Sequence, residues 1–84
     1  MKKLLTENNI FAQNLKNIRL EKKMTQEEVV TQLQLLGSPI SRSTYSLIEM
    51  GRGNIFISDL VGLQIIFNVD FDSFFKGITP YREN

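Results

Sequence analysis

The fold of this chain is decided by residues 24–52, which read MTQEEVVTQLQLLGSPISRSTYSLIEMGR. Thr25 is a favourable N-cap residue, and Glu28 three positions later completes a capping box, so a helix is expected to begin there. Gly37 and then Pro39 are expected to end this helix. Its inward face is expected to carry Val29, Val30, Leu33 and Leu36.

Ser41 is expected to cap the next helix, on which Tyr45 and Ile48 lie three residues apart on one inward face. At about 100° per residue, the outward positions then fall on Ser43, Ser46 and Leu47, with Arg42 on the flank. This outward face lacks the Asp, Glu and Lys that usually fill a solvated helix face. Small hydroxyl groups and one arginine would let the helix enter a DNA major groove. A solvated face rich in Ser and Thr is the alternative interpretation.

Outside this segment the chain predicts three more helices and therefore an all-α fold, a compact bundle of five helices. One helix is expected over residues 9–23, one after Ser58 and a short one capped by Asp70. The expected core residues in these helices are Phe11, Leu15, Ile18, Leu60, Leu63 and Phe67. We expect residues 1–8 to be an N-terminal extension, residues 9–77 the helical domain and residues 78–84 a loose C-terminal tail.

The composition excludes several classes of site. The chain has 84 residues, which is one small domain, and it contains no cysteine and no histidine. Thiolate zinc sites, cysteine nucleophiles and the commonest general base are therefore absent, so neither an enzyme nor a cofactor or metal is expected. No apolar run approaches the roughly 20 residues of a membrane span, and no apolar stretch follows Leu5 as in a signal peptide, so a cytoplasmic protein is expected.

The net charge of +1 does not by itself indicate a nucleic-acid partner, but its distribution is uneven. Residues 1–58 carry eight basic and five acidic side chains, whereas residues 59–84 carry two and four. The first two thirds of the chain are therefore mildly basic and the last third is acidic.

Together, Arg19, residues 24–30 and residues 40–52 resemble the Cro/cI-type (Xre family) helix-turn-helix of bacterial and phage repressors. The pattern T-Q-E-E followed by I-S-x-S-T-Y-S-x-I-E-x-G is specific, and Leu60 to Phe74 resembles the family's fourth and fifth helices. The resemblance covers roughly residues 9–76. It implies a lambda-repressor-like fold in which residues 9–77 form a helix-turn-helix DNA-binding domain.

The sequence departs from the family pattern at three places. Val30 stands where alanine is usual, and Leu47 stands where a polar or basic residue is usual. Residues 34–39 make the connection between the two helices about five residues longer than the common form. The second helix is therefore expected to be extended, and the crossing of the two helices is expected to differ from the usual form.

The resemblance assigns roles to individual positions. It places Arg42, Ser43, Ser46 and Leu47 at base-facing positions, with Leu47 able to pack on a thymine methyl group. It places near the DNA backbone Gln26, Ser41, Thr44, Arg52 and Asn54. Capping alone would also explain Ser41, and a solvated loop charge would also explain Arg52. Arg19 and Glu49 match a structural salt bridge that joins the first and third helices.

The resulting hypothesis is a sequence-specific DNA-binding transcriptional regulator, a repressor, that reads the major groove with residues 41–50. The alternative is a protein-interaction module of the same fold, such as an antitoxin or anti-repressor partner, suggested by the low net charge and by surplus apolar residues. Val61, Ile65 and Ile66 lie off the core stripe of their helix, which predicts a homodimer unless residues 4–5 or 56–57 cover them. A homodimer would bind a near-palindromic operator with half-sites roughly 34–36 Å apart. No small-molecule effector is expected.

Overall fold

The residues that the computed structural model describes, 3–4 and 8–80, form five helices and one pair of very short strands. The helices are α1 (Asn9–Glu21), α2 (Gln26–Leu35), α3 (Arg42–Glu49), α4 (Ile57–Phe67) and α5 (Asp72–Phe75). The strands β1 (Lys3–Leu4) and β2 (Ile55–Phe56) pair antiparallel, with Lys3 opposite Phe56 and Leu4 opposite Ile55. The predicted all-α fold with five helices is confirmed, while the strand pair was not predicted.

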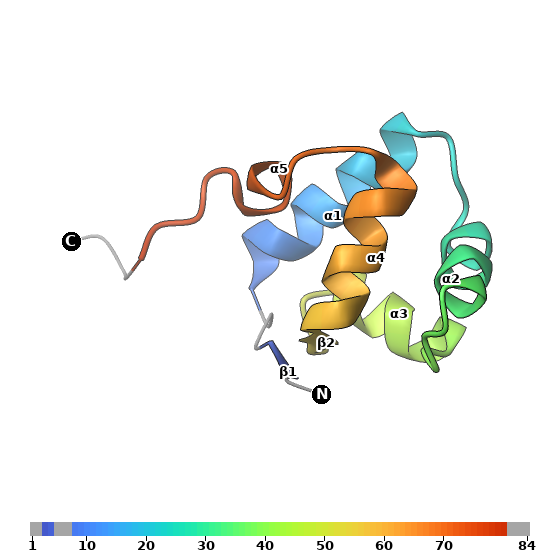
Figure 1. Cartoon of the computed structure of the whole chain (residues 1–84). Coiled ribbons are helices and arrows are strands. Elements are labelled where there is room, and N and C mark those ends of the chain that lie inside the picture. Colours follow the sequence, from blue (N-terminus) through green and yellow to red (C-terminus); the bar gives the residue numbers. More distant parts are fainter. Residues whose placement is uncertain (1–2, 5–7, 81–84) are drawn as a thin grey trace.

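The helices pack so that α2 and α3 lie on one side of α4 and α5 lies on the other side, against α1 (Figure 1). Helix α3 also contacts α1 and α2, and α2 contacts α4. Helices α2 and α3 are therefore fixed to the rest of the bundle by separate contacts, which hold the pair at a defined angle.

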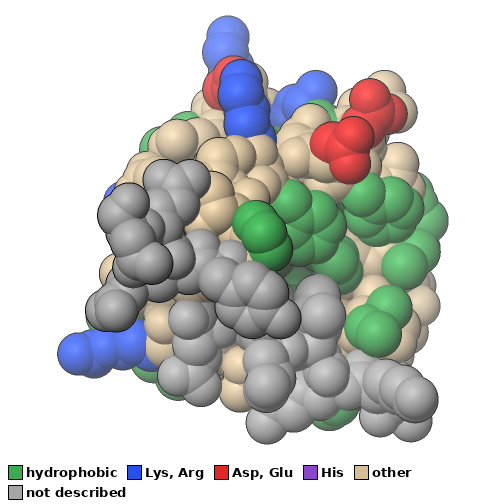
Figure 2. Space-filling view, turned by 90° about the vertical axis from the view of Figure 1, so that its left-hand side faces the viewer, with side chains coloured by type: hydrophobic (Ala, Val, Ile, Leu, Met, Phe, Trp, Pro, Cys, Tyr) green, Lys and Arg blue, Asp and Glu red, His purple; other side chains and the backbone are tan. Residues whose placement is uncertain are grey.

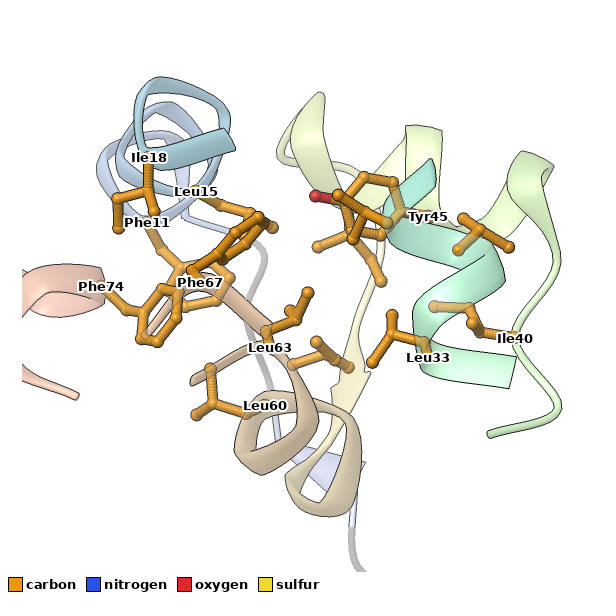
Figure 3. Packing of buried hydrophobic residues seen from close by; sticks show 14 residues of the cluster. Phe11, Leu15, Ile18, Leu33, Ile40, Tyr45, Leu60, Leu63, Phe67 and Phe74 are labelled. Atoms are coloured by element: carbon orange, nitrogen blue, oxygen red, sulfur yellow. The ribbon is translucent and has the colours of Figure 1, made fainter. Parts of the chain in front are cut away.

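The core is built from side chains of all five helices that point toward a common centre (Figure 3). It contains the predicted core residues Phe11, Leu15, Ile18, Val29, Val30, Leu33, Tyr45, Ile48, Leu60, Leu63 and Phe67. The inward placement of Leu36 was wrong, because its side chain is 56% exposed. Leu36 is the C-cap residue of α2, where the chain turns at Gly37 and leaves the core.

Local caps set most helix starts. Asn8 caps α1, since its Oδ1 accepts from the backbone N–H groups of Ile10 and Phe11, both at 2.9 Å. The capping box predicted for α2 is present: Glu28 N–H donates to Thr25 Oγ1 at 3.1 Å, and Thr25 N–H donates to Glu28 Oε1 at 2.8 Å. These contacts satisfy backbone N–H groups that have no partner inside a helix.

Two predicted starts were wrong. Helix α4 begins at Ile57, so Ser58 lies inside its first turn instead of capping it. The buried Ile55 just before the helix anchors the chain in the core, and this contact decides the start. Helix α5 has Phe71 at its N-cap position and no side-chain cap, so the predicted cap by the Asp70 side chain is not formed. Asp70 contributes only its backbone oxygen, which accepts from Ser73 N–H at 3.0 Å.

Helix α1 ends at Glu21, two residues before its predicted end, in a Schellman motif. Met24 N–H donates to Arg19 O at 3.2 Å, and Lys23 N–H donates to Leu20 O at 3.0 Å. This geometry requires a left-handed residue at Lys23, whose φ is +58°. Glycine usually fills such a position because it has no Cβ, so Lys23 is held there at an energetic cost.

We expect Lys23→Gly to raise the free energy of unfolding by about 0.5–1 kcal/mol, because removing the left-handed strain outweighs the entropy lost by glycine. Urea unfolding of the two proteins measures the difference. Lys22→Gly is the matched control: Lys22 has a φ of −83°, so glycine there is expected to destabilise. A Lys23→Gly protein no more stable than the wild type would contradict the strain argument.

The side of the molecule that carries α5 shows hydrophobic side chains gathered at its surface with acidic side chains beside them (Figure 2). In α5, Phe74 is buried, whereas Phe75 is 39% exposed. Phe71, just before the helix, is 42% exposed. Ile78 then packs partly buried against the core. The part of the predicted tail at residues 81–84 lies outside the described residues. None of the described helices is both long and apolar enough to cross a membrane.

Candidate nucleic-acid interface

Helices α2 and α3 form the candidate interface, and residues 36–41 join them in an ordered turn. The side-chain amide of Gln34 donates from Nε2 to Ile40 O at 2.9 Å, and Ile40 N–H donates to Ser38 Oγ at 3.1 Å. Ile40 is 7% exposed and belongs to the core cluster. The turn between α2 and α3, which is longer than in the family pattern, is therefore held both by these hydrogen bonds and by the buried Ile40.

Helix α3 has one buried and one open face. Tyr45 and Ile48 have no exposed side-chain surface, at 0% each, so this face is fixed in the core. The predicted base-facing residues lie on the other side: Arg42 and Ser43 are exposed, Ser46 is half-buried and Leu47 is 43% exposed. The open face therefore presents one guanidinium, small hydroxyl groups and one leucine.

The only acidic residue of α3, Glu49, is turned inward and paired with Arg19 of α1. Arg19 Nε donates to Glu49 Oε2 at 2.7 Å, and Nη2 donates to Oε1 at 3.0 Å, which is a bidentate contact. Arg19 Nη1 also donates to Met24 O at 2.9 Å. Both side chains are buried, with each residue 8% exposed. The pair thus ties α3 to α1 and to the turn before α2, which is the contact that the resemblance implied.

Two further side chains surround the Glu49 carboxylate. Gln26, at the start of α2, donates from Nε2 to Glu49 Oε1 at 3.1 Å. Burial alone would raise the pKa of Glu49, but its polar neighbours, above all the Arg19 guanidinium, outweigh this effect and lower that pKa. Burial raises the pKa of the neighbouring Tyr45, whose hydroxyl makes no hydrogen bond within the described part of the chain.

Three of the predicted backbone-contacting residues come together at the start of α3. Ser41 Oγ accepts from Thr44 N–H at 3.1 Å and donates to Thr44 Oγ1 at 3.0 Å. Ser41, Thr44 and Asn54 all border one surface hollow of about 200 Å³, which the buried Asp59 also borders. The structure therefore gathers two hydroxyl groups and an amide beside the N-terminus of α3, together with the Asp59 carboxylate.

Gln26 and Arg52 lie apart from this hollow. Gln26 is held by Glu49, and its side chain is half-buried. Arg52 is exposed and follows α3 directly, because Arg52 N–H donates to Leu47 O at 2.9 Å in a second Schellman motif. Gly51 supplies the left-handed residue of this motif, with a φ of +76°. A tight turn thus keeps Arg52 close to the end of α3.

The sequence interpretation missed Glu27, the second residue of α2. Its Oε2 lies 3.8 Å from Arg42 Nη1, so it pairs with a predicted base-contacting residue of the next helix. The two residues are 15 positions apart. No spacing rule within a helix relates them, and only the packing of α2 on α3 brings them together. A sequence signal for this contact does not exist.

Comparison with protein families matches residues 15–74 to the helix-turn-helix family of the Xre/Cro/cI type. No curated protein and no solved structure shows a significant match to this chain. The matched region contains α2, α3 and α4 completely, together with both members of the Arg19–Glu49 pair. With the helix pair, its buried anchor and its open α3 face in place, this chain belongs to the Xre/Cro/cI-type helix-turn-helix family of DNA-binding regulator domains.

Proposed function

We propose that this protein is a sequence-specific transcriptional repressor that reads the DNA major groove with α3. The open face of α3 is the observation that carries this proposal. Its one carboxylate, Glu49, is buried against Arg19, so the exposed side chains of the helix carry no negative charge toward DNA. A major groove about 12 Å wide admits an α-helix, and base edges there offer a distinct pattern of donors and acceptors.

In this proposal, four side chains of α3 face base edges: Arg42, Ser43, Ser46 and Leu47. The arginine fork matches guanine O6 and N7, the serine hydroxyls donate or accept, and the leucine packs on a thymine methyl group. The DNA backbone is contacted by Gln26, Ser41, Thr44, Arg52 and Asn54. The hollow at the start of α3 supports this division, since Ser41, Thr44 and Asn54 all border it.

Repression follows from occupancy, because a protein seated in the major groove excludes other proteins from the same base pairs. A DNA-binding regulator acts where the DNA is, and we propose the cytoplasm as its location on that ground. Neither a cofactor nor a small-molecule effector enters the proposal.

Selection from a random-sequence DNA pool tests the proposed function. Bound fragments are expected to converge on one motif, with affinity for that motif about 10³-fold or more above that for random DNA. Affinity for both is expected to fall as salt rises, because phosphate contacts release counterions. Convergence on no motif, with equal affinity for all fragments, would contradict the proposal and favour the protein-interaction module.

We further propose that the protein binds DNA as a homodimer through the exposed stripe of α4. Ile57, Val61 and Ile65 are 44%, 41% and 59% exposed, and they lie on one side of the helix. Ile66, predicted to be a surplus residue, packs partly buried against the core instead. Phe56 is itself exposed and Ile57 belongs to the stripe, so residues 56–57 add exposed apolar surface, and the side chains of residues 4–5 lie outside the described ones.

The dimer proposal predicts that sedimentation shows a dimer at micromolar concentration on a near-palindromic operator, with half-sites roughly 34–36 Å apart. Ile65→Glu is expected to lower operator affinity at least tenfold without unfolding the protein, because a buried unpaired carboxylate would disrupt the interface. Leu20→Glu is the control, since Leu20 is 53% exposed on α1, outside the stripe. A wild-type protein that stays monomeric both free and on DNA would exclude this interface.

A further inference from the structure

An exposed ion pair joins α2 to α3. Glu27 Oε2 meets only one nitrogen of the Arg42 guanidinium, Nη1, at 3.8 Å. The two side chains are 77% and 61% exposed, so both are open to solvent and to an approaching ligand. The contact leaves Nε and Nη2 of Arg42 unused by Glu27. These two nitrogens form one edge of the planar guanidinium, with two parallel N–H donors.

The charges at the two helix N-termini explain why Glu27 and Arg42 attract each other here. Arg42 is the first residue of α3, where the partial positive charge of the helix N-terminus repels a guanidinium. Glu27 lies in the first turn of α2, where the same effect favours a carboxylate. The capping box of α2 uses Glu28 and leaves Glu27 free of a capping role. Glu27 is therefore placed to offset the charge of Arg42 without being needed for the helix start.

Resting on the proposed function, we propose that Glu27 is a positioning residue that determines the specificity of DNA recognition. Through its electrostatic attraction to Nη1, 3.8 Å away, the carboxylate biases the guanidinium toward orientations in which the Nε–Nη2 edge faces the guanine of the operator. Its negative charge at the same surface also weakens attraction to the phosphates of DNA that lacks this guanine. Glu27 thus favours the correct site in two ways, through geometry and through charge.

Glu27→Gln tests this inference, because it removes the charge while keeping the size of the side chain. The preference for guanine over the other bases at the Arg42 position is expected to fall about two- to fivefold, the range that corresponds to an exposed ion pair. Affinity for random DNA is expected to rise. Binding to all single-base variants of the selected operator, and to random DNA, measures both. Glu21→Gln, at an exposed position outside the interface, is the matched control and should change neither.

Two further variants separate position from charge. Glu27→Asp keeps the charge but shortens the reach, so base preference is expected to fall while affinity for random DNA stays at the wild-type level. In an Arg42→Ala background, Glu27→Gln is expected to have no effect on base preference. An unchanged preference in Glu27→Gln, or an equal loss with and without Arg42, would overturn the positioning role.

The outcomes also distinguish this inference from the proposed function. If the wild type selects a motif and Glu27→Gln keeps its full preference, only the role of Glu27 fails. If the wild type selects no motif, both proposals fail together.

Discussion

Arg19→Ala is expected to lower the free energy of unfolding by about 3–5 kcal/mol, the cost of removing one partner from a buried ion pair. The guanidinium makes two hydrogen bonds to Glu49 and one to Met24 O, at 2.7, 3.0 and 2.9 Å. Its loss leaves the Glu49 carboxylate in a site that is 8% exposed, where Gln26 still donates a hydrogen bond to it at 3.1 Å. Urea unfolding followed by circular dichroism measures the change.

Two controls make this result interpretable. Arg52→Ala removes an exposed arginine near the same helix and is expected to change stability by less than about 0.5 kcal/mol. The double variant Arg19→Ala/Glu49→Ala is expected to lose clearly less than the sum of the two single variants, because it leaves no unpaired charge. Additive losses would mean that the two side chains are not coupled.

The same pair predicts how stability depends on pH. The pKa of Glu49 is lower in the folded protein than its ordinary value of 4.5, since Arg19 and Gln26 stabilise the carboxylate. Its stabilising contribution is therefore fully present above that ordinary value and is lost as pH falls through the lowered pKa. The difference in stability between the wild type and Glu49→Gln is thus expected to shrink as the pH is lowered from 6 toward about 3.

Arg42→Ala is expected to cost about 1–3 kcal/mol of binding free energy at one base pair of the operator and to relax the preference there. Arg42 is the only charged residue on the exposed start of α3, and its side chain is 61% exposed. Affinities for single-base variants of the selected operator measure the effect. A uniform loss on all sequences, with a salt slope reduced by about one, would instead identify Arg42 as a phosphate contact.

Arg52→Ala is the better reference for a uniform loss than Gln26→Ala. Gln26 donates to Glu49 at 3.1 Å, so its truncation also disturbs the anchor of α3. Arg52 lies exposed beyond the end of α3 and makes its loop contact through the backbone. An Arg42→Ala protein with unchanged affinity and unchanged preference would contradict the assignment of α3 as the recognition helix.

Tertiary packing decided the features that sequence reasoning missed or misplaced. Leu36 follows the apolar spacing of α2, yet the helix ends there and its side chain is 56% exposed. Helix α4 begins at Ile57 and not after Ser58, because the buried Ile55 fixes the preceding chain in the core. The pairing of residues 3–4 with residues 55–56 depends on two segments that no local pattern relates.

The sequence by itself determined the helix caps at Thr25 and Ser41 and the core stripes of the helices. These features depend on hydrogen bonds and side-chain periodicity within a few residues, so a short stretch of sequence is enough to predict each of them. Only the tertiary structure decided that Glu27 meets Arg42 and that Gln26 meets Glu49. Such contacts join residues on different helices, and their distances depend on how α2 packs against α3. The spacing of residues along the sequence does not predict that packing.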